Sequence, residues 1–303
     1  MTNIPTRGLT TALLACLAAS AAAEPARFAS PEEAVEALVA AGEAADRAAI
    51  LRIFGPEFED LIFTGDAEAD AAARTGFLHD YGVRHRIDRG PDEAILHIGR
   101  EDWPFPAPIV RKDEGWSFDG QSAREEVRLR RIGLNELDVI DVMRAAVRVQ
   151  ALYRQTDHDG DGVLEFAAGI LSTAGTRDGL YWPDEPGTEQ SPIGAFIARA
   201  SADGYNFDGT DSAPEPYLDY YFRILQKQGP SAPGGEMDYM VNGNMLAGHA
   251  ILAYPANYGE TGIMSFMVGE NGIVLEADLG PDTLAIGNET TVFDPGEGWT
   301  AVE

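Results

Sequence analysis

Residues 135–162, NELDVIDVMRAAVRVQALYRQTDHDGDG, contain the longest amphipathic segment of the chain and, directly after it, its most informative loop. Apolar side chains recur at helical spacing on one face as far as Thr156, and charged side chains occupy the opposite face. This pattern predicts one long helix packed against a core. Its apolar positions include Leu137, Ile140, Met143 and Val147. The acidic, glycine-containing run 157–162 predicts where the helix ends.

The acidic loop, residues 157–165, matches the first part of an EF-hand calcium loop. Aspartates fill positions 1, 3 and 5 of that pattern, and Gly162 at position 6 permits the sharp turn. The predicted ligands are Asp157, Asp159, Asp161, Val163 through its carbonyl, and Glu165 at position 9. Position 12 is Ala168 instead of the bidentate glutamate that closes such a loop. We therefore predict a weak, structural Ca²⁺ site, with an acidic helix terminator that binds no ion as the alternative.

The N-terminus reads as a targeting segment. Arg7 supplies a positive charge, and the apolar run 9–19 that follows is too short to span a bilayer. Small residues at 21–23 suit cleavage before Glu24. Residues 1–23 are therefore predicted to be a signal peptide, and the mature protein is expected to be periplasmic or secreted. No later stretch is long and apolar enough to predict a membrane helix.

Cys16 is the single cysteine of the chain. The run 13–16 (LLAC) loosely resembles a bacterial lipoprotein signal, so a lipid anchor at Cys16 is the alternative to a plain signal peptide. With ordinary cleavage the mature chain has no cysteine, which excludes disulfides. A metal site would then have to use oxygen or histidine ligands.

The formal net charge of −28 restricts the classes of partner. Such a surface repels nucleic acid and anionic lipid, so neither is expected to bind, whereas an envelope protein remains a possible partner. Because 45% of the residues are hydrophobic, the acidity does not indicate disorder. A chain of 303 residues is longer than one small core usually needs, which favours two domains.

The periodicity predicts an α+β fold with two domains. In residues 25–120, helices beginning at Ser30-Pro31 precede short strands that start after Gly90-Pro91. Residues 121–133 are charged and form a predicted helical connector. In residues 134–303, the long helix and the acidic loop precede an antiparallel β-meander. Its turns are predicted at Asn242-Gly243 and at 270–272.

Other catalytic signals are weak. The histidines are His79, His85, His97, His158 and His249. They form no HExxH or close His/Cys group, so a catalytic zinc site is not expected. His158 falls at a non-ligand position of the loop and is expected to be exposed, whereas His249 falls in a strand pattern and is expected to be hydrogen-bonded and structural. The chain has no Gly-x-Ser-x-Gly motif. We assign no catalytic residue.

Several segments together resemble one family. They are 30–34 (SPEEA), 102–106 (DWPFP), 131–137 (RIGLNEL), 162–166 (GVLEF), 177–183 (RDGLYWP), 220–225 (YYFRIL) and 238–243 (DYMVNG). On these segments the chain resembles the exported bacterial proteins catalogued as domain of unknown function 2950. The resemblance covers nearly all of the mature chain and implies export, but no activity.

Two further resemblances concern the halves. The helices followed by a sheet in the first domain are similar to the cone-shaped domains of the nuclear transport factor 2-like kind. The long helix with its meander resembles the globular head of type IV pilins and pseudopilins, including Tyr221-Phe222-Arg223 and 258–266 (YGETGIMSF). Unlike a pilin helix, this one is internal and charged, so the resemblance concerns the head fold alone.

The sequence favours an exported, soluble, non-enzymatic protein with a structural or binding role in the cell envelope and a Ca²⁺-stabilised loop. The alternative is a small-molecule-binding protein or hydrolytic enzyme that uses a pocket in the first domain's cone. Such a pocket requires a cavity with converging titratable groups of shifted pKa. A third possibility is a module that binds a partner through the edge of the meander or an aromatic patch.

Overall fold

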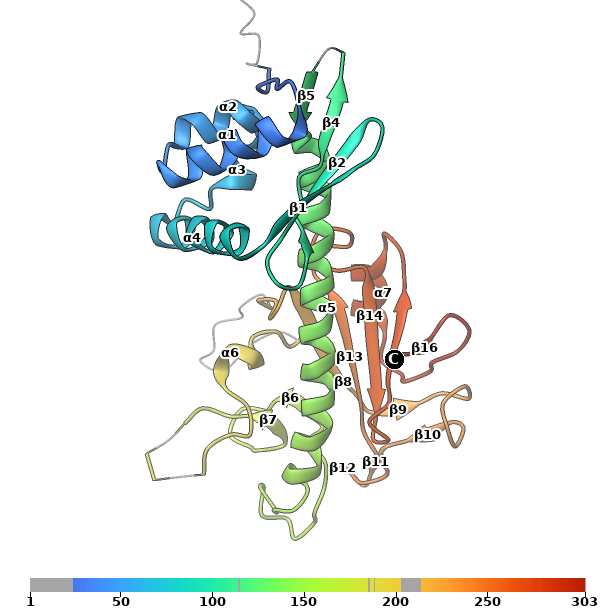
Figure 1. The fold of residues 1–303 in the computed structure, drawn as a ribbon. Helices are drawn as coiled ribbons and strands as arrows, with labels where there is room; N and C mark the ends of the chain where they lie inside the picture. The colour runs from blue at the N-terminus through green and yellow to red at the C-terminus, as the bar shows by residue number, and fades with distance from the viewer. Residues whose placement is uncertain (1–23, 114, 185, 188, 203–213, 303) are drawn as a thin grey trace, which may run out of the picture. The chain divides into compact units, whose positions relative to one another are not determined.

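The computed structural model describes residues 24–113, 115–184, 186–187, 189–202 and 214–302. The chain forms two compact units, one ending at Glu126 and the other beginning at Val127. Both units combine helices with antiparallel sheets, which confirms the predicted α+β class (Figure 1). The predicted signal peptide and Cys16 lie outside the described residues.

The helices of the first unit begin at the predicted capping residue. Ser30 accepts a hydrogen bond from the backbone N–H of Glu33 at 3.2 Å, and Pro31 occupies the first turn. The carboxylate of Glu33 accepts from the N–H of Ala29, so the entry to the helix is held from both sides. The helical segments are α1 (Pro31–Glu43), α2 (Arg47–Phe54), the 3₁₀ turn η1 (Pro56–Phe58), α3 (Glu59–Ile62) and α4 (Ala67–Val83).

One antiparallel sheet completes the first unit. Its strands are β1 (His85–Arg89), β2 (Glu93–Ile98), β3 (Trp103–Pro104), β4 (Ile109–Lys112) and β5 (Gly115–Phe118), in the order β1-β2-β4-β5 with β3 also paired to β2. Burial alternates along β2, where Ala94, Leu96 and Ile98 face the core. The rings of Phe54 and Phe118 lie 4.9 Å apart in that core. Apolar side chains from α1, α2 and the sheet fill the interior.

A single helix, α5 (Gly120–Tyr153), covers both the predicted connector and the predicted long helix. The sequence predicts two segments, with the connector ending at Gly133. One glycine costs a helix only about 1 kcal/mol relative to alanine, which is too little to end a helix of this length. The boundary between the two units therefore falls within a continuous helix.

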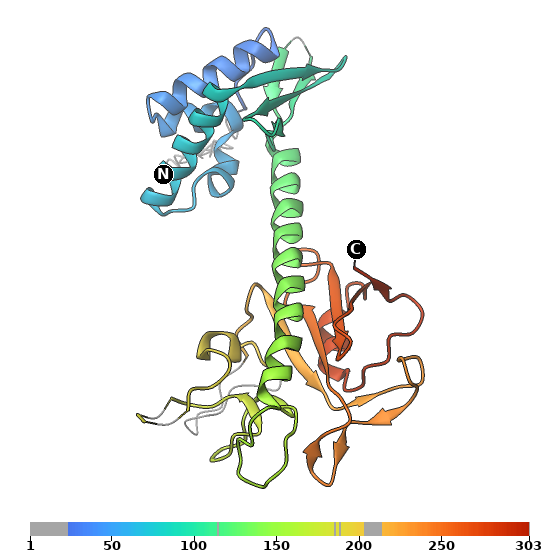
Figure 2. The same ribbon diagram turned by 60° about the horizontal axis from the view of Figure 1, so that its bottom comes forward.

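The second unit is built on a five-stranded antiparallel sheet. Its strands are β8 (Tyr220–Leu225), β13 (Ala250–Pro255), β14 (Met264–Gly269), β15 (Val274–Asp278) and β16 (Thr300–Ala301), in the order β16-β15-β14-β13-β8. Val139, Ile140 and Met143 of α5 belong to the same core as the strands, and Figure 2 shows α5 running beside the sheet. The helix α7 (Thr283–Glu289) also packs on β13, which is buried at all six of its residues.

Short elements surround this sheet. They are the parallel pair β6 (Gly169–Leu171) and β7 (Gly179–Tyr181), α6 (Ala195–Ala198), β9 (Lys227–Gln228), β10 (Met237–Asp238), β11 (Met240–Val241) and β12 (Asn244–Met245). The predicted turn at Asn242-Gly243 joins β11 to β12, with φ of 53° and 98°. The predicted turn at 270–272 joins β14 to β15.

Candidate metal centre

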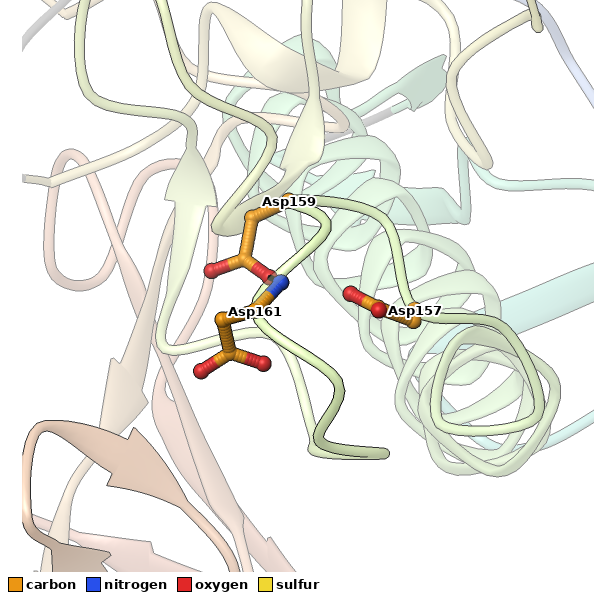
Figure 3. Close-up of side chains that lie close together, drawn as sticks. All are labelled: Asp157, Asp159 and Asp161. Carbon is orange, nitrogen blue, oxygen red and sulfur yellow. Dashed lines mark hydrogen bonds between the residues drawn. The ribbon is translucent and has the colours of Figure 1, made fainter.

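The end of α5 leads directly into the acidic loop. Asp157, Asp159 and Asp161 each offer one carboxylate oxygen, and these oxygens lie within 4.8 Å of one another. Asp157 is partly buried, whereas Asp159 and Asp161 are exposed. Figure 3 shows Asp157 beside the end of the helix and turned toward the other two side chains. Of the five predicted ligands, these three are the ones that the structure gathers into a cluster.

Backbone amides hold the carboxylate of Asp157 in place. Its Oδ1 accepts from the N–H of Gly160 at 2.7 Å, and its Oδ2 accepts from the N–H of Gly162 at 2.9 Å. Both glycines have positive φ, 81° and 87°, which side chains would disfavour. The N–H of Gly162, and then that of Gly160, hold the pKa of Asp157 below its usual range. Asp157 is therefore ionised at neutral pH, as a cation ligand must be.

The other two carboxylates are fixed in the same way. Asp159 Oδ1 accepts from the N–H of Asp161 at 3.2 Å, and Asp161 Oδ1 accepts from the N–H of Val163 at 2.7 Å. A carboxylate has about four lone-pair sites, so each group keeps oxygen lone pairs for a cation. Three ionised groups this close repel one another, and a bound divalent cation would remove that repulsion.

Glu165 contacts the hairpin that carries β12. Its Oε2 accepts from the backbone N–H of Met245 at 2.8 Å, and the chain then pairs with β12 through Phe166 N–H and the Met245 carbonyl at 2.9 Å. Burial, followed by the charges of Asp159 and Asp161, raises the pKa of Glu165. Glu165 thus fastens the loop to β12, close enough to the aspartates to feel their charge.

Asn244 contacts the cluster and was not identified from the sequence. Its amide Nδ2 donates to Asp161 Oδ2 at 2.6 Å, across 83 positions of the chain. An asparagine side chain also has a carbonyl oxygen, so rotation of the amide would present another hard ligand. The predicted turn at Asn242-Gly243 located the hairpin, but no local pattern showed that the hairpin reaches the acidic loop.

The prediction that His158 is exposed is wrong. Its side chain is only 5% exposed, because the ring packs between Tyr153 at 4.3 Å and Trp182 at 5.4 Å. Its Nε2 lies 3.1 Å from the Tyr153 carbonyl, and its Nδ1 lies 3.3 Å from a Glu189 oxygen. The second residue of the loop therefore anchors the loop to the body of the unit.

The prediction that His249 is a hydrogen-bonded residue is also wrong. Its residue surface is 1% exposed, and neither ring nitrogen has a hydrogen-bond partner among the described residues. It precedes β13 instead of lying within a strand. Burial, and secondarily the positive charge of Arg154, lowers the pKa of His249 to about 4. The imidazole is thus neutral at physiological pH.

The pocket proposed for the first domain would need converging titratable groups. The hollow described in the first unit has a volume of about 560 Å³ and is lined by Arg27, Phe28, Ala29, Asp113 and Gly115. Its two charged side chains pair with each other at 3.1 Å and are largely exposed. The interior between the helices and the sheet is filled by apolar side chains. Among the described residues that line the hollow, no acid and base pair of the kind that hydrolysis uses is brought together.

Among the described residues, no helix is both long enough and apolar enough to cross a membrane. No curated protein and no solved structure matches the chain. The nuclear transport factor 2-like and pilin-head comparisons therefore stay predictions. The family described as "Protein of unknown function (DUF2950)" matches residues 26–302. Because that match covers nearly the whole chain, the protein belongs to this family.

Proposed function

We propose that the protein is an exported, non-enzymatic component of the cell envelope whose second unit is stabilised by one Ca²⁺ ion in the acidic loop. The convergence of Asp157, Asp159 and Asp161 within 4.8 Å carries this proposal. Their alternation in the chain and the glycine at the sixth position match the way in which short loops surround hard cations. Weak affinity suffices outside the cell, where calcium is present at millimolar concentration.

The position of the loop explains what the ion would do. The loop begins at the end of α5 and is fastened to β12 through Asp161 with Asn244 and through Glu165 with Met245. Neutralising the three carboxylates would strengthen the junction between the helix and this hairpin. The site would therefore act on stability.

Thermal unfolding of the protein lacking residues 1–23 tests the calcium proposal. We expect a higher midpoint in millimolar CaCl₂ than in EGTA, and we expect Asp159→Ala to abolish the difference. Asp141→Ala is the matched control, because it removes an aspartate that is 81% exposed on α5. Equal unfolding midpoints for the unmodified protein in calcium and in chelator would contradict the calcium proposal.

Export rests on the pattern of residues 1–23 and has its own test. Expression of the full chain in a Gram-negative host, followed by fractionation and N-terminal sequencing, should give a periplasmic protein that begins at Glu24. A lipid-modified N-terminus at Cys16 would support the anchored alternative. Retention of Met1 in the cytoplasm would contradict export.

A further inference from the structure

A cavity of about 200 Å³ lies in the second unit, and its lining includes none of the three aspartates of the acidic cluster. It is lined by segments far apart in sequence: Gln228 of β9 with Pro233, Met237 of β10 with Tyr239, the chain 247–249 before β13, the residues 269–271 at the end of β14, and Phe293. A space of this size holds several water molecules or one small organic molecule. The calcium proposal assigns no role to this cavity.

His249 lines this cavity and is the unusual group within it. Both of its ring nitrogens are buried without a hydrogen-bond partner among the described residues. Leaving such a group buried and unsatisfied is costly, so native proteins seldom tolerate it without a ligand or water. One ring face is covered by Phe166, whose centroid lies 4.6 Å away. The torsion about the Cβ–Cγ bond is soft, so the ring can turn a nitrogen toward a molecule in the cavity.

Tyr239 and Gln228 form a second polar part of the cavity lining, and hydrogen bonds hold both side chains in place. The hydroxyl of Tyr239 donates to Gln228 Oε1 at 2.7 Å, and Gln228 Nε2 donates to the carbonyls of Pro233 and Gly235. The Tyr239 oxygen keeps lone pairs that can accept from a ligand. Burial, followed by the charge of Glu270, raises the pKa of Tyr239 to about 12, so the hydroxyl stays neutral. This wall is rigid before any ligand arrives.

The charges around the cavity compensate one another. Glu270 lines it, and Arg154 approaches the Glu270 carboxylate at 3.8 Å. Neutral His249 offers one donor and one acceptor, and the Tyr239 hydroxyl offers an acceptor. Pro233, Met237 and Phe293 add apolar surface. The surroundings thus match a small uncharged molecule whose groups both donate and accept hydrogen bonds.

We propose that this cavity is a binding site for a small neutral polyhydroxylated molecule, a polyol or monosaccharide, with a hydroxyl group bonded to the ring of His249. Each hydroxyl of such a ligand both donates and accepts, which suits the two ring nitrogens. Its C–H surface would lie against Phe293 and Met237. An anionic ligand would meet Glu270 and the strongly acidic protein, and a cationic ligand would have to displace Arg154 from Glu270.

Nuclear magnetic resonance of the mature protein with labelled histidine tests the proposal. Glycerol and D-glucose are the probes, with D-gluconate and D-glucosamine as charged analogues. We expect the His249 ring signals to shift saturably with at least one neutral probe, and at least tenfold weaker binding of both charged analogues. His79, His85, His97 and His158 lie outside the cavity lining, so their ring signals serve as the internal control.

Two variants serve as controls. His249→Phe removes the ring nitrogens, and backbone amide shifts of the cavity residues should then lose saturation. Ala247→Phe fills the space from an exposed position of the lining, so it should block binding even if His249→Phe fails to fold. Linear, unsaturable shifts with both neutral probes, or equal binding by the unmodified protein and Ala247→Phe, would overturn the proposal and leave water as the occupant.

Discussion

The side-chain amide of Gln150 pairs in both directions with the backbone of Ala167. Its Nε2 donates to the Ala167 carbonyl at 3.0 Å, and its Oε1 accepts from the Ala167 N–H at 2.9 Å. Both residues are 0% exposed. The pair joins the last turn of α5 to the chain just beyond the acidic loop, so the loop is closed at its base by a buried contact that requires no ion.

Gln150→Leu should be strongly destabilising. The substitution leaves the N–H and the carbonyl of Ala167 buried without partners, at a cost of about 2–4 kcal/mol in the free energy of unfolding. Urea denaturation, followed through the unfolding transition of the second unit, measures this change in the free energy of unfolding. Gln155→Leu is the matched control, because the exposed Gln155 side chain donates to the Ala151 carbonyl just before it in the chain. A similar small effect of both substitutions would show that the pair does not close the loop.

Glu136 is expected to hold the start of β14. Its Oε1 accepts from the backbone N–H groups of Ile263 and Met264 at 2.8 and 2.9 Å. Bonds to a charged acceptor are worth about 1.5–3 kcal/mol, so Glu136→Ala should lower the free energy of unfolding by about 2 kcal/mol or more. Asp138→Ala, at an exposed position of the same helix, should change it little. Faster amide hydrogen exchange at Ile263 and Met264 in the Glu136 variant would show that the stability is lost at the start of β14.

Two glycines should respond in opposite directions to alanine. A Cβ at Gly179 would lie 2.4–2.5 Å from backbone atoms of Leu171 and Ser172, so β6 and β7 would have to separate. We expect Gly179→Ala to cost more than about 2 kcal/mol. A Cβ at Gly133 meets nothing within 4 Å, and this residue is inside α5. Gly133→Ala should therefore stabilise the protein by about 0.5–1 kcal/mol, measured by thermal unfolding.

His249 should make stability depend on pH. Its pKa is lowered to about 4 in the folded protein, with burial as the first cause and Arg154 as the second, while the unfolded value is near 6.5. The folded state therefore binds its proton less readily, so this contribution to stability is complete above about pH 6.5 and is lost as the pH falls toward 4. The loss amounts to roughly 3 kcal/mol.

Denaturation between pH 7 and pH 4 checks this dependence on His249. Glu270 and Arg154 are the charged groups beside the cavity. His249→Phe should flatten the profile relative to the unmodified protein, whereas His79→Phe, at an exposed position of α4, should not. Parallel profiles for the unmodified protein and the His249 variant would contradict the burial argument.

The sequence predicted those parts of the fold that depend on local patterns. The Ser30-Pro31 helix start follows from capping, and the Asn242-Gly243 turn follows from the positive φ that these residues tolerate. The main meander strands follow from their short runs of apolar and aromatic residues. The continuity of α5 did not, because one glycine marks a possible break without enforcing it. The parallel pair β6–β7 was also missed, since its three-residue strands carry no periodicity.

The candidate sites divide in the same way. The three aspartates follow from spacing within one loop, and the structure brings them together. The contacts of Asn244 and Glu165 depend on where β12 lies, about 80 positions further along the chain. The packing of His158 depends on the loop that contains Trp182. The unpartnered state of His249 depends on five separate segments around one cavity, and no local pattern reports it.

Calorimetric titration of Ca²⁺ into the chelator-treated mature protein tests the central claim most directly. The account predicts saturable binding of one ion per chain, and loss of that binding in Asp161→Asn, while Asp141→Asn keeps it. Mg²⁺ at the same concentration should bind more weakly, because it requires a stricter geometry than this open loop provides. The absence of saturable binding by the unmodified protein at millimolar Ca²⁺ would contradict the account.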